Sequence, residues 1–204
     1  MTAIIDYGVG NLFSVVSSFK HIGADVVVTS DPQVIRKSKR ILLPGVGAFK
    51  DAIDKLRKTG LDKVIIDEVK GGKPILGICL GMQLLFEKSY EYGEHEGLGL
   101  LKGSVVPMRD KIDPMLKVPQ IGYNALIVKK ESPLFKYVKD GDFVYFVHSY
   151  YATDCDESLL ATCEYDVEMT ASVAYKNIFG CQFHPEKSAD VGLNILRAFS
   201  EMEA

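Results

Sequence analysis

The chain has 204 residues, a hydrophobic fraction of 47%, a charged fraction of 25% and a formal net charge of −3. This length suffices for one α/β domain with a sizeable core, and the composition is ordinary for a globular protein. The charge gives no basic field of the kind that binds nucleic acid or an anionic membrane, and no apolar run is long enough to span one. We expect a single domain over residues 1–204.

The cysteines argue against a disulfide or metal framework. Their spacings match no zinc or redox motif, and the first residues resemble a strand more than a signal peptide. A reduced, cytoplasmic setting is therefore expected, with no cofactor and no metal. Three of the four are interpreted as small buried hydrophobic residues: Cys155, Cys163 and Cys181.

The first half of the chain alternates strand and helix patterns. Strands are expected at 3–6, 24–29, 40–43 and 74–76, and helices at 12–22, 49–58 and 61–69. This βαβα order predicts a parallel sheet with helices on both faces. Ligands bind beyond the carboxyl ends of such strands, where the turn Pro44–Gly47 and Cys79 both lie.

The second half has shorter strands with turns between them. Strands are expected at 104–106, 125–128, 143–147, 150–153, 159–164, 170–175 and 178–183, with a last helix over 189–202. Their spacing predicts an antiparallel portion that continues or flanks the sheet. The fold class is therefore α/β, with an open, mixed but mainly parallel sheet.

The segment Gly77-Ile78-Cys79-Leu80-Gly81 follows a buried strand and precedes a helical pattern that starts Met82-Gln83-Leu84-Leu85-Phe86. It matches the nucleophile elbow, in which glycines flank a nucleophile on a sharp strand-to-helix turn. Side chains at the glycine positions would collide in such a turn. At a helix N-terminus the Cys79 thiolate would gain from backbone N–H groups and the helix dipole.

A base for this nucleophile is found near the C-terminus, where His184, Pro185 and Glu186 follow a buried strand. In an extended chain, residues two apart point to the same side, so Glu186 is expected to accept a hydrogen bond from the imidazole. The other ring nitrogen would then face a thiol. The sequence predicts a Cys-His-Glu triad.

The tetrahedral intermediate of acyl transfer needs an oxyanion hole. The Leu80 N–H, directly after the nucleophile, is one natural donor, and the second is expected from the turn Pro44–Gly47. Peptide bonds next to glycine rotate at little steric cost, so a peptide flip in this turn could switch activity on. We expect Gly45→Ala to test this flip.

Several motifs in order resemble the class I glutamine amidotransferases, and among them the glutaminase subunits of imidazole glycerol phosphate synthase in histidine biosynthesis. The resemblance extends from Asp6 to Ser188. The segments that carry it are Asp6–Asn11, Pro44–Phe49, Gly77–Gln83, Pro119–Asn124, Phe146–Tyr150 and Gln182–Ser188.

The resemblance implies a flavodoxin-like sheet and hydrolysis of glutamine to glutamate and ammonia. It places the second oxyanion donor near Val46 or Gly47. The residues that it implies for contacts with the glutamine substrate are Gly47, Gln83, Glu91, Ser149 and Tyr150.

The resemblance also implies a (β/α)8-barrel cyclase subunit as the partner of a heterodimer. The cyclase would use the ammonia to make imidazole glycerol phosphate and aminoimidazole carboxamide ribotide. Tyr123, Asn124, Tyr145 and Lys187 are the residues expected on the docking face. Tyr123 stands where the family often has Trp, and this chain contains no Trp.

Alternative functions remain open from the sequence. The nearest is a glutaminase subunit of another amidotransferase complex, which would share the triad. A second is a non-catalytic regulatory relative, against which the intact Cys79, His184 and Glu186 argue. A nicotinamide site is rejected because Phe13 replaces the third glycine of the loop Gly8–Gly10. His148 is interpreted as a structural or pocket-lining residue.

Overall fold

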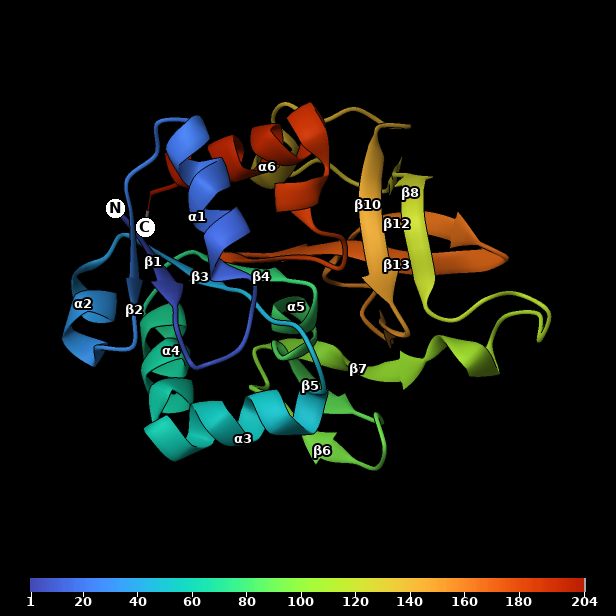
Figure 1. Cartoon of the computed structure of the whole chain (residues 1–204), viewed down its shortest axis with the longest axis horizontal. Helices are drawn as coiled ribbons and strands as arrows, with labels where there is room; N and C mark the ends of the chain where they lie inside the picture. The colour runs from blue at the N-terminus through green and yellow to red at the C-terminus, as the bar shows by residue number, and fades with distance from the viewer. Residues whose placement is uncertain (204) are drawn as a thin grey trace.

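An eight-stranded sheet runs through the computed structural model, which describes residues 1–203 (Figure 1). The strand order is β2-β1-β3-β4-β14-β13-β12-β9, parallel from β2 to β14 and antiparallel from β14 to β9. This order confirms the predicted α/β class with an antiparallel C-terminal portion. The strands are β1 (Thr2–Ile5), β2 (Val26–Thr29), β3 (Arg40–Leu43), β4 (Ile75–Ile78), β9 (Ile127–Val128), β12 (Leu159–Tyr165), β13 (Val167–Tyr175) and β14 (Ile178–Cys181).

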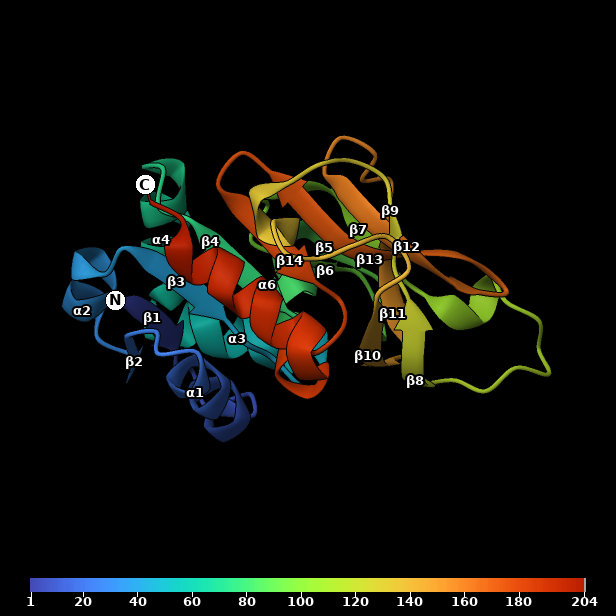
Figure 2. The ribbon, with the colours of Figure 1, turned by 90° about the horizontal axis from the view of Figure 1, so that it is seen from above.

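Helices cover both faces of the parallel part (Figure 2). Alternate strand residues point to opposite sides, so Ala3 and Ile5 pack in one core layer and Ile4 in the other. The first layer lies under α2 (Pro32–Lys37), α3 (Phe49–Thr59) and α4 (Leu61–Lys70), and the second under α1 (Leu12–His21) and α6 (Ala189–Glu201).

Two smaller sheets flank the C-terminal part. One has the order β11-β7-β5-β6, and the other pairs β10 with β8. Val144 and Phe146 of β10 pack in the same core layer as Cys163 of β12, while the other face of β8 and β10 stays open. The strands are β5 (Phe86–Ser89), β6 (His95–Glu96), β7 (Leu101–Pro107), β8 (Gln120–Ala125), β10 (Phe143–His148) and β11 (Tyr150–Thr153).

The structure corrects several predicted elements. The helix after Cys79, α5, covers only Leu80–Gln83, and Phe86 begins β5. The chain leaves the helix because the Leu84 and Leu85 carbonyls accept hydrogen bonds from Leu98 and Leu100. Helix α2 and strands β5, β6 and β8 were not predicted, since the strand expected at 125–128 overlaps β8 only at Ala125. Three 3-10 turns complete the fold: η1 (Met108–Asp110), η2 (Pro133–Phe135) and η3 (Pro185–Lys187).

All four cysteines are free and buried. Burial raises the pKa of Cys155, of Cys163 to about 12, and of Cys181, so these three thiols are poor nucleophiles. No helix of residues 1–203 is long and apolar enough to cross a membrane.

Candidate active site

Cys79 lies on the sharp turn between β4 and α5, with φ 54° and ψ −114°. The flanking glycines are sterically required. A Cβ atom on Gly81 would lie 1.9 Å from the Leu43 carbonyl oxygen, and one on Gly77 would lie 2.6 Å from the Gly81 carbonyl oxygen. The turn has the geometry of the predicted nucleophile elbow.

The His184 and Glu186 side chains meet as expected, but on a different backbone. His184 Nδ1 and Glu186 Oε1 are 2.8 Å apart, and both side chains are almost fully buried. The backbone is extended at His184 but turns into η3 at Pro185, because proline favours the first position of a helix. The expectation of an extended chain through Glu186 was therefore wrong.

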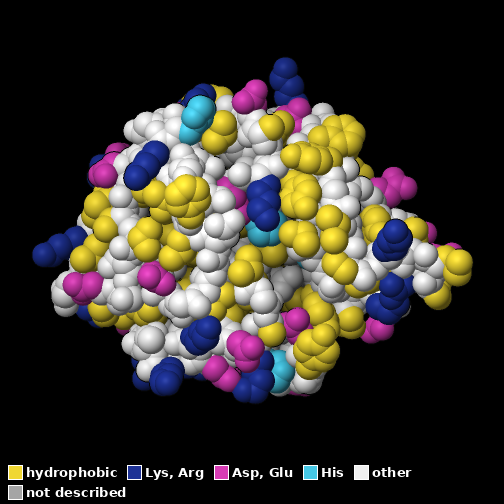
Figure 3. Space-filling model, viewed as in Figure 1, with side chains coloured by type: hydrophobic (Ala, Val, Ile, Leu, Met, Phe, Trp, Pro, Cys, Tyr) yellow, Lys and Arg dark blue, Asp and Glu magenta, His cyan; other side chains and the backbone are white. Residues whose placement is uncertain are grey.

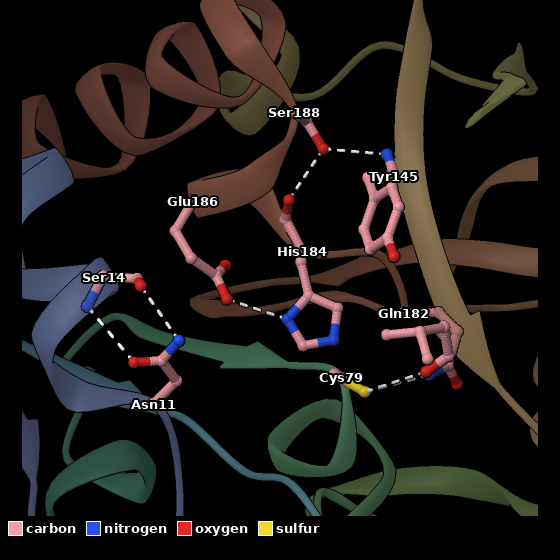
Figure 4. A network of polar contacts seen from close by, with 9 residues as sticks. Asn11, Ser14, Cys79, Tyr145, Gln182, His184, Glu186 and Ser188 are labelled. Atoms are coloured by element: carbon pink, nitrogen blue, oxygen red, sulfur yellow. Dashed lines mark hydrogen bonds and ion pairs between the residues drawn. The ribbon is translucent and has the colours of Figure 1, made fainter. Parts of the chain in front are cut away.

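The electrostatics of the site favour a charged imidazole. Burial acts to lower the pKa of His184, but the nearby Cys79 and the Glu186 carboxylate outweigh it and raise the pKa to about 9. His184 Nε2 has no hydrogen-bond partner within residues 1–203 and lies on the side of the ring nearer to Cys79 (Figure 4). A protonated imidazole there can pair with a thiolate, the reactive form of cysteine.

Gln182 is a site residue to which no role was assigned from the sequence. Its side chain is fully buried, and its amide Nε2 donates to Cys79 Sγ over 3.8 Å. The amide orientation is fixed because Gln83 Nε2 donates to both the Tyr150 carbonyl and Gln182 Oε1. Gln182 therefore presents a donor to the sulfur. Its position two residues before His184 was the available signal.

A cavity of about 690 Å³ opens beside Cys79. Ten residues expected at the site line it, from five different parts of the chain. They are Val46, Gly47, Cys79, Leu80, Gln83, Glu91, Ser149, Tyr150, His184 and Lys187. Glu186 lies behind His184 and does not line the cavity. Arg109 also lines it and was not predicted.

Hydrogen bonds fix the residues expected to hold glutamine. Glu91 accepts a hydrogen bond from the Phe49 backbone N–H at the start of α3, and burial raises the pKa of its carboxyl group. The Tyr150 carbonyl accepts from Gln83, and the Ser149 carbonyl accepts from the Met108 N–H. These hydrogen bonds hold the polar residues of the cavity in place.

The segment Pro44–Gly47 has one packed and one open glycine. A Cβ atom on Gly45 would lie 2.8 Å from the Gly81 backbone nitrogen, so Gly45→Ala would collide whether or not a peptide flips, and it is not the clean test expected from the sequence. Gly47 has φ +93°, and a Cβ atom added to it would meet no atom within 4 Å. Any rotation of this segment is easiest near Gly47.

The four residues expected on the docking face do not all point to the same side of the β8–β10 pair. Tyr123 is 54% exposed and stacks edge-on against Tyr145, with Lys187 Nζ 5.7 Å from the Tyr145 ring centre. Asn124 points to the opposite side, where it accepts from Gln120 and donates to the Glu164 carbonyl. Only Tyr123, Tyr145 and Lys187 therefore share the open face.

His148 is held on both ring nitrogens. Nδ1 lies 2.9 Å from the Tyr150 carbonyl and Nε2 lies 2.9 Å from Gln120 Oε1. Burial lowers its pKa to about 4, so the ring is neutral at physiological pH. His148 lines the cavity as a fixed structural residue, in agreement with its interpretation from the sequence.

Comparisons with known proteins agree with this geometry. The class-I glutamine amidotransferase family matches residues 3–201. The chain is 50% identical over 203 residues to imidazole glycerol phosphate synthase subunit HisH of Caldanaerobacter subterraneus, covering 99% of this chain and 98% of the relative. It is 48% identical over 207 residues to the same subunit of Bacillus subtilis, covering 100% and 97%. The chain therefore belongs to the class-I glutamine amidotransferases, and within them to the HisH subunits of imidazole glycerol phosphate synthase.

Solved structures support the fold. A glutamine amidotransferase superposes with a TM-score of 0.75 at 18% identity, covering 97% of this chain and 98% of that one. A putative GMP synthase subunit from Thermoplasma acidophilum superposes with a TM-score of 0.71 at 22% identity, covering 98% and 91%.

Proposed function

We propose that this chain hydrolyses the side-chain amide of glutamine and delivers the ammonia to a cyclase subunit of imidazole glycerol phosphate synthase. The observation that carries the proposal is one cavity that holds a strained Cys79 beside a His184–Glu186 pair joined at 2.8 Å. The family assignment supplies the histidine pathway.

The triad residues divide the chemistry. The Cys79 thiolate attacks the amide carbon, and His184 gives its proton to the departing ammonia, which leaves a γ-glutamyl thioester. A water molecule then loses a proton to His184 and attacks the thioester, which releases glutamate and restores the thiolate beside a protonated His184. Glu186 keeps the imidazole oriented throughout.

The other cavity residues stabilise the oxyanion and bind the glutamine substrate. The Leu80 N–H is free to act as an oxyanion donor because the first N–H groups of a helix have no partner within it. A backbone N–H from Val46 or Gly47 supplies the second donor. Glu91 pairs with the substrate ammonium group, while Gln83, Ser149 and Tyr150 orient the amino-acid end of glutamine. These roles follow the family resemblance and the positions of the residues around the cavity.

The partner that we propose is a (β/α)8-barrel cyclase in a heterodimer, with the ammonia passed between the two subunits in the cytoplasm. Hydrophobic side chains gather beside the hollow on the face in Figure 3, over β8 and β10. Tyr123, Tyr145 and Lys187 belong to this docking face, joined by the exposed Ile121 and Phe143. Such a contiguous apolar patch is typical of an interaction surface.

Glutamate release from glutamine tests the proposal, measured with this chain alone, with the cyclase, and with the cyclase plus its nucleotide substrate. Cys79→Ala is the blank. We expect low activity alone and a large increase in the complete mixture. Strong activity that ignores the cyclase would instead assign the chain to another amidotransferase complex. No activity in any mixture would indicate a non-catalytic regulatory relative.

A further inference from the structure

The phenol ring of Tyr7 lies buried behind the segment Pro44–Gly47 and does not line the cavity. Its side chain is only 5% exposed, and its hydroxyl group donates a hydrogen bond to the Pro44 carbonyl over 2.8 Å. Neither the triad nor the proposed substrate contacts use this residue. Its position raises the question of what the hydroxyl group holds in place.

The order of the strands explains how Tyr7 reaches this segment. Strands β1, β3 and β4 are neighbours and parallel, so their carboxyl ends lie side by side. Tyr7 follows β1, Pro44 follows β3 and Cys79 follows β4. The segment Pro44–Gly47 is therefore flanked by the tyrosine on one side and by the nucleophile on the other.

Gly45 is confined between these two neighbours. A Cβ atom at this position would lie 2.9 Å from the Tyr7 hydroxyl oxygen, 2.8 Å from the Gly81 backbone nitrogen and 3.0 Å from Leu80 Cβ. The tyrosine hydroxyl group and the start of α5 therefore both lie close to Gly45 and leave the first half of the segment little room to move towards them. Leu80, which we propose as an oxyanion donor, belongs to the same contact.

The chain just beyond the segment is held as well. Two residues after Gly47, the Phe49 N–H donates to the Glu91 carboxylate. Between the two ends Val46 is 42% exposed, and Gly47, at φ +93°, has open space around it. The two anchors therefore leave the peptide groups around Val46 and Gly47 as the part that can move.

We propose that Tyr7 is a positioning residue for the oxyanion hole: its hydroxyl group fixes the Pro44 carbonyl and confines movement of the segment to Val46 and Gly47. The inference rests on the proposed oxyanion role of this segment. Donors that are fixed in advance stabilise a developing oxyanion because they need not reorganise during the reaction. Burial raises the pKa of Tyr7, so the phenol stays protonated as a donor.

Tyr7→Phe tests the proposal because it removes one oxygen atom. We expect kcat for glutamine hydrolysis in the complete synthase to fall about tenfold, less than the loss of an oxyanion donor itself, with KM for glutamine unchanged within about twofold. The matched control is Tyr165→Phe. Tyr165 also donates to a backbone carbonyl over 2.8 Å, that of Lys117, but lies at the end of β12, and we expect wild-type activity.

Alkylation of Cys79 by iodoacetamide separates positioning of the oxyanion hole from general damage. The thiolate displaces iodide in this reaction and no oxyanion forms, so we expect Tyr7→Phe to react at the wild-type rate. An unchanged kcat would overturn the proposal, and so would a fall in alkylation rate that matches the fall in kcat. Wild-type protein without Cys79-dependent glutamate release would contradict the proposed function instead.

Discussion

Two opposing influences set the pKa of His184: burial lowers it, whereas the neighbouring Cys79 and Glu186 raise it. Its pKa is about 9 in the folded protein, against an ordinary value of 6.5. The folded chain therefore keeps a proton that the unfolded chain releases. The stability that this group contributes is fully present below pH 6.5 and is lost as the pH rises through about 9.

Glu186→Gln should reduce this pH dependence because it removes the carboxylate but keeps an acceptor for Nδ1. Between pH 6.5 and 9, we expect the free energy of unfolding to fall less in the variant than in the wild type, by about 1 kcal/mol. Urea unfolding at four pH values measures it. The control is Glu168→Gln on the surface, and parallel curves for Glu186→Gln and the wild type would contradict the prediction.

Gln182 directs a single amide donor at the Cys79 sulfur. In Gln182→Glu a carboxylate replaces this donor and places negative charge beside the thiolate. We expect alkylation of Cys79 by iodoacetamide at neutral pH to slow about tenfold, as for the loss of a hydrogen bond to a charged group. Mass spectrometry of the Cys79 peptide gives the rate. Gln33→Glu, on the exposed start of α2, should react like the wild type, and equal rates for all three proteins would refute a role for Gln182.

At the scale of elements, local patterns predicted most of the strands and longer helices, whereas contacts distant in sequence set the exceptions. The end of α5 at Gln83 depends on hydrogen bonds from Leu98 and Leu100, which no local pattern contains. In contrast, the Asp31 cap and Pro32 were visible signals from which α2 could have been predicted. The proximity of Cys79 and the His184–Glu186 pair could be predicted because these residues belong to two short motifs. Gln182 and Tyr7 were not assigned roles because their contacts depend on which strands lie side by side.

The elbow between β4 and α5 should be intolerant of any side chain at Gly81. A Cβ atom there would lie 1.9 Å from the Leu43 carbonyl oxygen, and the other nearest atoms also belong to the backbone of Leu43 and Pro44, so no flexible side chain can give way. We expect Gly81→Ala to lower the free energy of unfolding by about 3 kcal/mol or more. Gly60→Ala is the control, because a Cβ atom on Gly60 would meet open space and only the left-handed backbone of this helix cap would be strained, which should cost about 1 kcal/mol. Equal losses in urea unfolding would contradict the steric explanation.

At the scale of the whole molecule, the order of the strands places Cys79 and His184 at the same edge of the sheet, with the open face of β8 and β10 beside them. Cys79 follows β4 and His184 follows the adjacent β14, although they are far apart in sequence. The β8–β10 pair packs next to them, and the His184 N–H donates to the Tyr145 carbonyl in β10. A partner that covers this face would therefore contact a strand bonded directly to the triad.

Ile121→Lys tests whether the cyclase occupies this face. Ile121 is 63% exposed on β8, opposite Val147, so a lysine there should leave the free energy of unfolding within about 0.5 kcal/mol. Placing a charge in the apolar centre of the interface should weaken the affinity for the cyclase at least about tenfold. Stimulated glutaminase activity should then return at saturating cyclase, because the triad is intact. Val28→Lys, on the edge strand β2 at the other end of the sheet, should bind normally. Equal affinities of the two variants for the cyclase, measured by calorimetry, would place the partner elsewhere.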